Sequence, residues 1–144
     1  MKISIAVIGD ESLYNKIKDM PFPHKIYISE DIALALKMHD GRSDYHVVIR
    51  SGKITKNFYK DLVTALESMP EKSLVSLCLD KSITRTSGVY ISKKLLVDNA
   101  IAIPTKDIYK ALDRGLKGKP FDKIKSYYRD NFDVVYYFDI VKGV

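Results

Sequence analysis

Four polar segments follow apolar runs in this chain, and their side chains are of kinds that bind phosphates or cations. They are Gly9-Asp10-Glu11, Ser29-Glu30-Asp31, Arg50-Ser51-Gly52-Lys53 and the stretch 80–88. An arginine guanidinium carries a permanent positive charge and donates two parallel hydrogen bonds to a phosphate, whereas carboxylates hold divalent cations. The third segment therefore offers phosphate-binding chemistry, and the first two offer acidic oxygens.

Other common reactive motifs do not occur in the sequence. His24, His39 and His46 are scattered and lack metal-ligand spacing, and the single Cys78 forms no internal disulfide. Cys78 stands in an apolar run, which favours a small buried hydrophobe. The glycine patterns of dinucleotide-binding and P-loop proteins are also missing. We therefore expect neither a bound metal nor a cofactor.

The four polar segments are separated by alternating strand and helix patterns. Continuous or alternating apolar residues predict strands at 2–8, 25–28, 45–49, 74–79, 89–91, 99–103 and 134–138. Helical spacing with caps or stop signals predicts helices from residue 12 to 20, and at 29–39, 55–69, 105–114 and 122–130. This order indicates an α/β fold, a three-layer α/β/α sandwich with a mainly parallel sheet. Ligands of such sheets bind beyond the carboxyl ends of the strands, where the four segments would lie.

The length and composition fit one ordinary domain. The chain has 144 residues, of which 46% are hydrophobic and 29% are charged. This is too short for two independent cores with a linker, so we expect a single domain over 1–144. Uncharged runs such as 73–79 are far shorter than the roughly 18 to 20 apolar residues of a membrane helix. We therefore expect a cytoplasmic protein without a membrane partner.

The net charge of +6 is concentrated in the second part of the chain. Residues 1–50 contain seven basic and seven acidic side chains, whereas residues 51–144 contain seventeen basic and eleven acidic ones. A basic surplus favours polyanionic partners such as the phosphates of nucleotides or nucleic acids. The same surplus also serves solubility, so both interpretations stay open.

The element order resembles a known family. The likeness rests on four consecutive features of the sequence. They are the strand Tyr45-His-Val-Val-Ile49, the helix at 55–69 ending at Pro70, the strand at 74–79, and the run Asn99-Ala-Ile-Ala-Ile-Pro104 that leads into a helix. Together they resemble the small glycosyltransferase-like proteins of GT-A type found in bacteria and phages, over about residues 1–138. The resemblance implies a GT-A-like, Rossmann-like topology and binding of a nucleotide sugar.

The sequence departs from this family where the metal site belongs. After the strand that ends at Ile49, the family has an Asp-x-Asp or Asp-Asp motif, whereas this chain has Arg50-Ser51-Gly52. Carboxylates are needed there to hold the cation that stabilises the leaving phosphate. Arg50, with Ser51 beside it, either clamps a phosphate in place of the metal or is an ordinary surface residue.

Two acidic residues match other functional positions of the family. The resemblance places Asp10 near the nucleoside and Asp122 as the general base. Each has a simpler interpretation, because an acidic residue at a helix start caps the helix or interacts favourably with its dipole. We therefore expect a degenerate glycosyltransferase-like domain, a pseudoenzyme that binds a nucleotide sugar but lacks metal-dependent transfer.

A second hypothesis belongs to a different functional class. The stretch 121–138 combines seven aromatic residues with basic ones, and the polar stretch before it contains a basic loop with Lys81, Arg85, Lys93 and Lys94. Aromatic rings between cations are suited to nucleic acid or to a protein interface, and equally to a core with an adjoining contact surface. The alternative is a non-catalytic, phage-type protein that binds a host protein or nucleic acid.

Overall fold

The strands predicted from the sequence are all present, and they form one sheet. The computed structural model describes residues 1–19, 26–29, 41–50, 52–69, 72–77, 90–92, 100–108, 135–138 and 140–141. The elements are β1 (Ile3–Ile8), α1 (Glu11–Lys18), β2 (Ile26–Ser29), β3 (Tyr45–Ile49), α3 (Phe58–Ser68), β4 (Val75–Ser76), β5 (Tyr90–Ser92), β6 (Ala100–Pro104) and β7 (Val135–Tyr137). Residues 105–108 begin a further helix, as predicted. The helices predicted at 29–39 and 122–130 lie outside the described residues.

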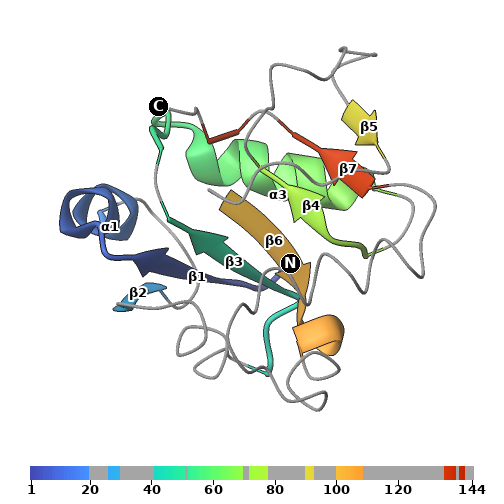
Figure 1. The fold of residues 1–144 in the computed structure, drawn as a ribbon, viewed down its shortest axis with the longest axis horizontal. Coiled ribbons are helices and arrows are strands. Elements are labelled where there is room, and N and C mark those ends of the chain that lie inside the picture. Colours follow the sequence, from blue (N-terminus) through green and yellow to red (C-terminus); the bar gives the residue numbers. More distant parts are fainter. Residues whose placement is uncertain are drawn as a thin grey trace.

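The sheet is mixed rather than mainly parallel. Its strand order is β2-β1-β3-β6-β4-β7-β5. The pairs β1 with β2, β1 with β3 and β4 with β7 are parallel, whereas β6 is antiparallel to both of its neighbours and β5 is antiparallel to β7. Five strands therefore run in one direction, and β6 runs against them inside the sheet (Figure 1). The sequence pattern did not indicate the reversal, because a buried apolar strand has the same composition in either direction.

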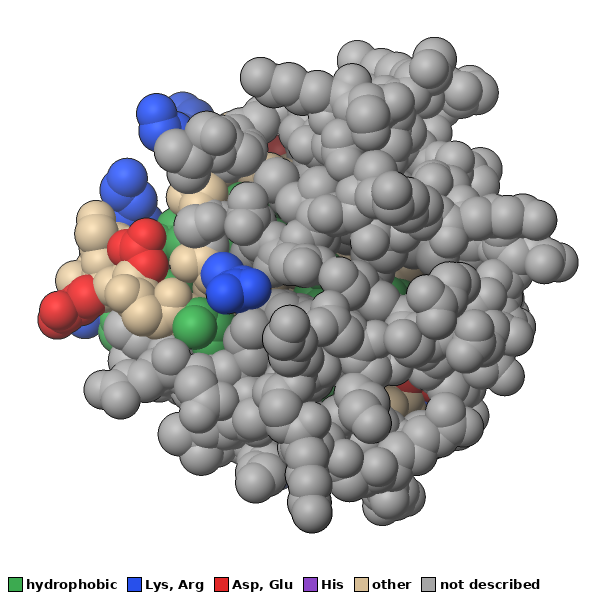
Figure 2. Space-filling model, viewed as in Figure 1, with side chains coloured by type: hydrophobic (Ala, Val, Ile, Leu, Met, Phe, Trp, Pro, Cys, Tyr) green, Lys and Arg blue, Asp and Glu red, His purple; other side chains and the backbone are tan. Residues whose placement is uncertain are grey.

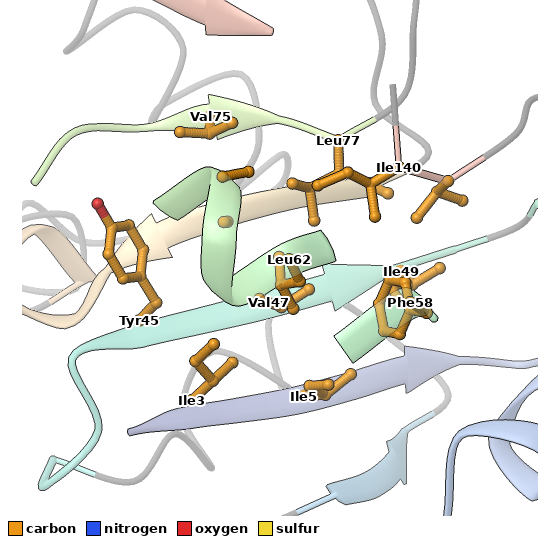
Figure 3. Close-up of a cluster of buried hydrophobic side chains, with 14 of the residues drawn as sticks. Ile3, Ile5, Tyr45, Val47, Ile49, Phe58, Leu62, Val75, Leu77 and Ile140 are labelled. Carbon is orange, nitrogen blue, oxygen red and sulfur yellow. The ribbon is translucent and has the colours of Figure 1, made fainter. Parts of the chain in front are cut away.

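Helices α1 and α3 pack on the same face of the sheet. The odd-numbered residues of β1 and β3 belong to one buried cluster with Leu13 and Ile17 of α1 and Phe58 and Leu62 of α3. In Figure 3, Leu62 lies over Val47, and Phe58 lies beside Ile49. The apolar residues of α3 recur at helical spacing, so its inner face is apolar while its outer face carries charged groups.

The opposite face of the central strands is buried too. Ala6, Val48, Ile101 and Ile103 are each at most 1% exposed, and they alternate along their strands with the residues of the first cluster. Burial on both faces explains why these strands appear in the sequence as nearly continuous apolar runs. β1 is buried along its length apart from its half-buried end at Ile8.

The start of α3 differs slightly from the prediction. The helix predicted at 55–69 begins instead at Phe58, and Asn57 occupies the cap position. The carbonyl oxygen of Thr55 accepts a hydrogen bond from the Phe58 backbone N–H at 3.1 Å, so residues 55–58 form a turn before the helix. None of the helices in the described parts of the chain has the length and apolar content needed to cross a lipid bilayer.

Candidate functional site

Two of the polar segments singled out in the sequence lie side by side at one edge of the sheet. β1 and β3 are parallel neighbours, with Val7 paired to Ile49. The chain continues from β1 into Gly9 and Asp10, and from β3 into Arg50. Neighbouring strands are about 4.8 Å apart, so the two segments leave the sheet next to each other. β2 ends at the same edge, because its Ser29 pairs with Ile8. We call this the carboxyl edge.

Arg50 is exposed at the carboxyl edge. Its guanidinium forms no ion pair with any other residue that the structure describes. Two residues later, Gly52 has a φ of 128°, a conformation that favours glycine. A free guanidinium held at the end of a buried strand has the charge and the hydrogen-bond donors to bind a phosphate.

Asp10 caps helix α1. Its Oδ1 accepts a hydrogen bond from the Leu13 backbone N–H at 2.9 Å, and the residue before it, Gly9, has a φ of 66°. The side chain satisfies an N–H group that has no partner within the helix, and its negative charge lies at the positive helix end. The simpler of the two sequence interpretations is thereby confirmed. A role near a nucleoside stays a prediction.

Arg50 is the first of several exposed cations in residues 50–60, which we call the cationic segment. It contains four basic side chains, Arg50, Lys53, Lys56 and Lys60, and no acidic one. All four are exposed. Lys53 belongs to one of the polar segments predicted from the sequence, whereas Lys56 and Lys60 were not predicted as site residues. The signal that could have found them is the absence of any acid over eleven residues.

Figure 2 shows charged side chains on one face of the molecule. Seen from the viewpoint of Figure 1, the visible described charges gather on the side where α1 lies, and both blue basic and red acidic groups are present. The acidic groups belonging to α1 and its cap include Asp10 and Glu11. Segments of opposite charge therefore leave the neighbouring strands β1 and β3.

At the opposite, amino edge of the sheet, Asp44 joins three segments of the chain. Its Oδ2 accepts a hydrogen bond from the Lys2 backbone N–H at 2.9 Å, and its Oδ1 lies 2.6 Å from Lys72 Nζ. Its backbone oxygen accepts from the Thr105 N–H at 3.1 Å. The contacts with Lys72 and then with Lys2 lower the pKa of the Asp44 carboxyl. These contacts connect the starts of β1 and β3 with the segment before β4 and the end of β6.

Several polar groups near the amino edge are buried. The Tyr45 hydroxyl accepts a hydrogen bond from the Ser73 backbone N–H at 3.3 Å, and burial, with smaller effects of Asp107 and Asp44, raises the Tyr45 pKa to about 12. Thr105 Oγ1 is buried without a hydrogen-bond partner among the described residues. This group of residues was not identified from the sequence, since its members are far apart along the chain.

His46 lies in the interior of the described sheet. It is fully buried, and its Nδ1 lies 2.8 Å from Ser4 Oγ across the β1–β3 pair. The described residues contain no group of three or more histidine, cysteine, aspartate or glutamate side chains placed to hold a metal.

Some predicted site residues fall outside the described parts of the chain. They are Ser51, Asp122 and the basic-loop residues Lys81, Arg85, Lys93 and Lys94. Cys78, which was predicted to be a buried hydrophobe, also lies outside the described residues. Of the predicted nucleotide-binding residues, the structure therefore places two, Asp10 and Arg50, and both are at the carboxyl edge.

Comparison with known proteins gives no relative for this chain. No family model matches it, and neither a curated protein nor a solved structure is significantly similar to it.

Proposed function

We propose that the carboxyl edge of this cytoplasmic domain binds the phosphates of a nucleotide, with Arg50 as the main contact. The observation that carries the proposal is the parallel pairing of β1 and β3, which sets the Gly9-Asp10 turn beside Arg50. A nucleotide across these two segments would meet a cation and two turns whose glycines allow close approach of the backbone. The proposed ligand is a nucleotide sugar or its nucleoside diphosphate.

The proposed architecture is a GT-A-like, three-layer sandwich. The strand order with parallel β2, β1 and β3 at one side supports this proposal, as does burial of both faces of the central strands. The described helices α1 and α3 would form one outer layer. The carboxyl ends of parallel strands are where such folds bind their ligands, so the proposed fold and the proposed site agree.

The residue types at this edge favour binding over metal-dependent transfer. The position after β3, where the resembling family has a carboxylate pair, holds Arg50, and a guanidinium cannot coordinate a cation. It can neutralise a diphosphate with two parallel hydrogen bonds. Asp122 is proposed as the base should transfer occur, but binding of the nucleotide does not depend on it.

Isothermal calorimetry tests this proposal. The wild-type protein is titrated with UDP, GDP, ADP, CDP and their common sugar conjugates, first in EDTA and then with Mn²⁺. We expect binding of at least one diphosphate in EDTA, lost in Arg50→Ala and retained in Lys2→Ala, which removes an exposed cation at the amino edge. Absence of binding across the panel, or equal losses in both variants, would overturn the proposal.

A further inference from the structure

The cationic segment carries a large share of the net charge of this protein. Its four basic residues give +4 within eleven residues, against +6 for the whole chain. All four side chains are exposed, and among the described residues none of them forms an ion pair. A run of cations with no acidic residue between them attracts polyanions.

The cations are spaced regularly along the sequence of this segment, and we refer to them as a row. They recur every three or four residues, from the end of β3 to the first turn of α3. Phe58 is fully buried, and Ile54 packs against the core, so apolar contacts anchor the segment. The Phe58 N–H bond to Thr55 and the Asp61 N–H bond to the Asn57 oxygen, at 3.0 Å, fix the turn into the helix. Such a row suits a partner that has several phosphates along a chain.

An aromatic ring accompanies this row. Tyr59 follows the anchor Phe58, and its ring packs against the core while remaining partly exposed. Burial raises the pKa of the Tyr59 phenol, with a further contribution from Glu67. Accessible aromatic faces beside cations are used by proteins to bind single strands, because every base has a face that stacks, and the exposed part of the Tyr59 ring is the candidate for this role.

From the row of cations and the adjoining ring, we infer that the cationic segment binds single-stranded nucleic acid. Arg50, Lys53, Lys56 and Lys60 contact successive phosphates, and Tyr59 stacks on a base. The interaction includes Arg50 but does not require the nucleotide site proposed above. It is also independent of the basic loop and the C-terminal aromatic residues considered in the sequence analysis.

Fluorescence anisotropy with a labelled oligo(dT) or oligo(U) of twelve nucleotides tests the inference, at NaCl concentrations from 20 to 200 mM. Each phosphate contact with a single strand contributes a slope of about −0.7 to the plot of log affinity against log salt. Four contacts predict a slope of about −2.8. The double variant Lys53→Ala with Lys56→Ala removes two contacts and should reduce the magnitude of this slope by about 1.4.

Matched variants make the result specific. Lys2→Ala with Lys16→Ala removes the same charge from exposed positions outside the segment and should leave the slope unchanged. Tyr59→Leu keeps an apolar side chain for packing and should weaken binding without changing the slope. Circular dichroism checks that each variant is folded, and a variant that fails this check is replaced by the Lys→Gln equivalent.

Three outcomes would overturn the inference: no binding at 20 mM NaCl, equal losses in the two lysine pairs, or equal affinity for a twelve-residue polyglutamate. The last would indicate a general attraction to anions. Calorimetry with the diphosphate that binds best separates this inference from the nucleotide site. If the wild type does not bind the strand but the double variant Lys53→Ala with Lys56→Ala still binds the diphosphate, single-strand binding by the cationic segment is rejected and the nucleotide site is not. Strand binding without diphosphate binding would reject the nucleotide site alone.

Discussion

Val7 of β1 and Ile49 of β3 are direct partners in a parallel strand pair. Both side chains are fully buried, and each strand ends at this pair or one residue after it. The chain then leaves the sheet as Gly9-Asp10 on one side and as Arg50 on the other. The segments that carry the acidic helix cap and Arg50 therefore leave the sheet from neighbouring strands, and we propose that both contact one ligand.

Removing the cap of α1 should destabilise the protein. Asp10→Ala deletes the oxygen that accepts the Leu13 N–H, which typically costs about 1 kcal/mol. Asp10→Asn keeps an accepting oxygen and should cost only a fraction of that. Urea unfolding measures both variants. A cost for Asn equal to that for Ala would show that the charge, rather than the hydrogen bond, stabilises the helix start.

Substitutions at Gly9 should destabilise the protein in proportion to how strongly each side chain disfavours a positive φ. Gly9 has a φ of 66°, and a Cβ there would meet no atom within 4 Å, so only the backbone conformation opposes substitution. Gly9→Ala should therefore cost about 1–2 kcal/mol. Gly9→Asn should cost less, because asparagine visits this region more readily. Thermal unfolding distinguishes the two, and equal losses would point to a clash instead.

The Asp44 contacts predict a small loss of stability in acid. The folded state lowers the pKa of Asp44, so folding is favoured above the ordinary value of 3.8, and this contribution is lost as the pH falls below it. Lys72 is about half exposed, so the pair contributes less than about 1 kcal/mol. Unfolding free energies at pH 6 and pH 3 should differ less in Asp44→Asn than in the wild type. An identical difference in the two proteins would contradict this account.

Tyr45 predicts the opposite behaviour in alkali. The folded protein keeps its phenolic proton up to a pKa of about 12, whereas an unfolded chain loses it near 10, so stability should fall as the pH rises between these values. Tyr45→Phe removes this dependence. It also leaves the buried Ser73 N–H without its partner, which costs about 1 kcal/mol or more at neutral pH. Denaturation at pH 7 and pH 11 tests both effects. A loss of unfolding free energy between these pH values that is as large in the variant as in the wild type would contradict them.

The sequence predicted the elements better than their arrangement. Apolar runs such as 45–49 located the strands because burial on both faces leaves a clear pattern. The antiparallel direction of β6 could not be inferred, since Ala100–Pro104 would be equally apolar in a parallel pairing. Asp10 and Arg50 could be proposed as neighbours because segments after parallel strands share an edge. The Asp44 and Tyr45 contacts could not, because they join segments that only the fold brings together.

The proposed phosphate-binding site consists of the two segments that follow β1 and β3. The most direct measurement is an NMR titration of the ¹⁵N-labelled protein with pyrophosphate in EDTA. We predict that the amide signals of Gly9, Arg50 and Gly52 shift together and saturate at one dissociation constant, while those of Asp44 and Thr105 at the amino edge stay in place. Signals at Gly9 and Arg50 that remain unchanged, or that shift with different constants, would contradict this proposal.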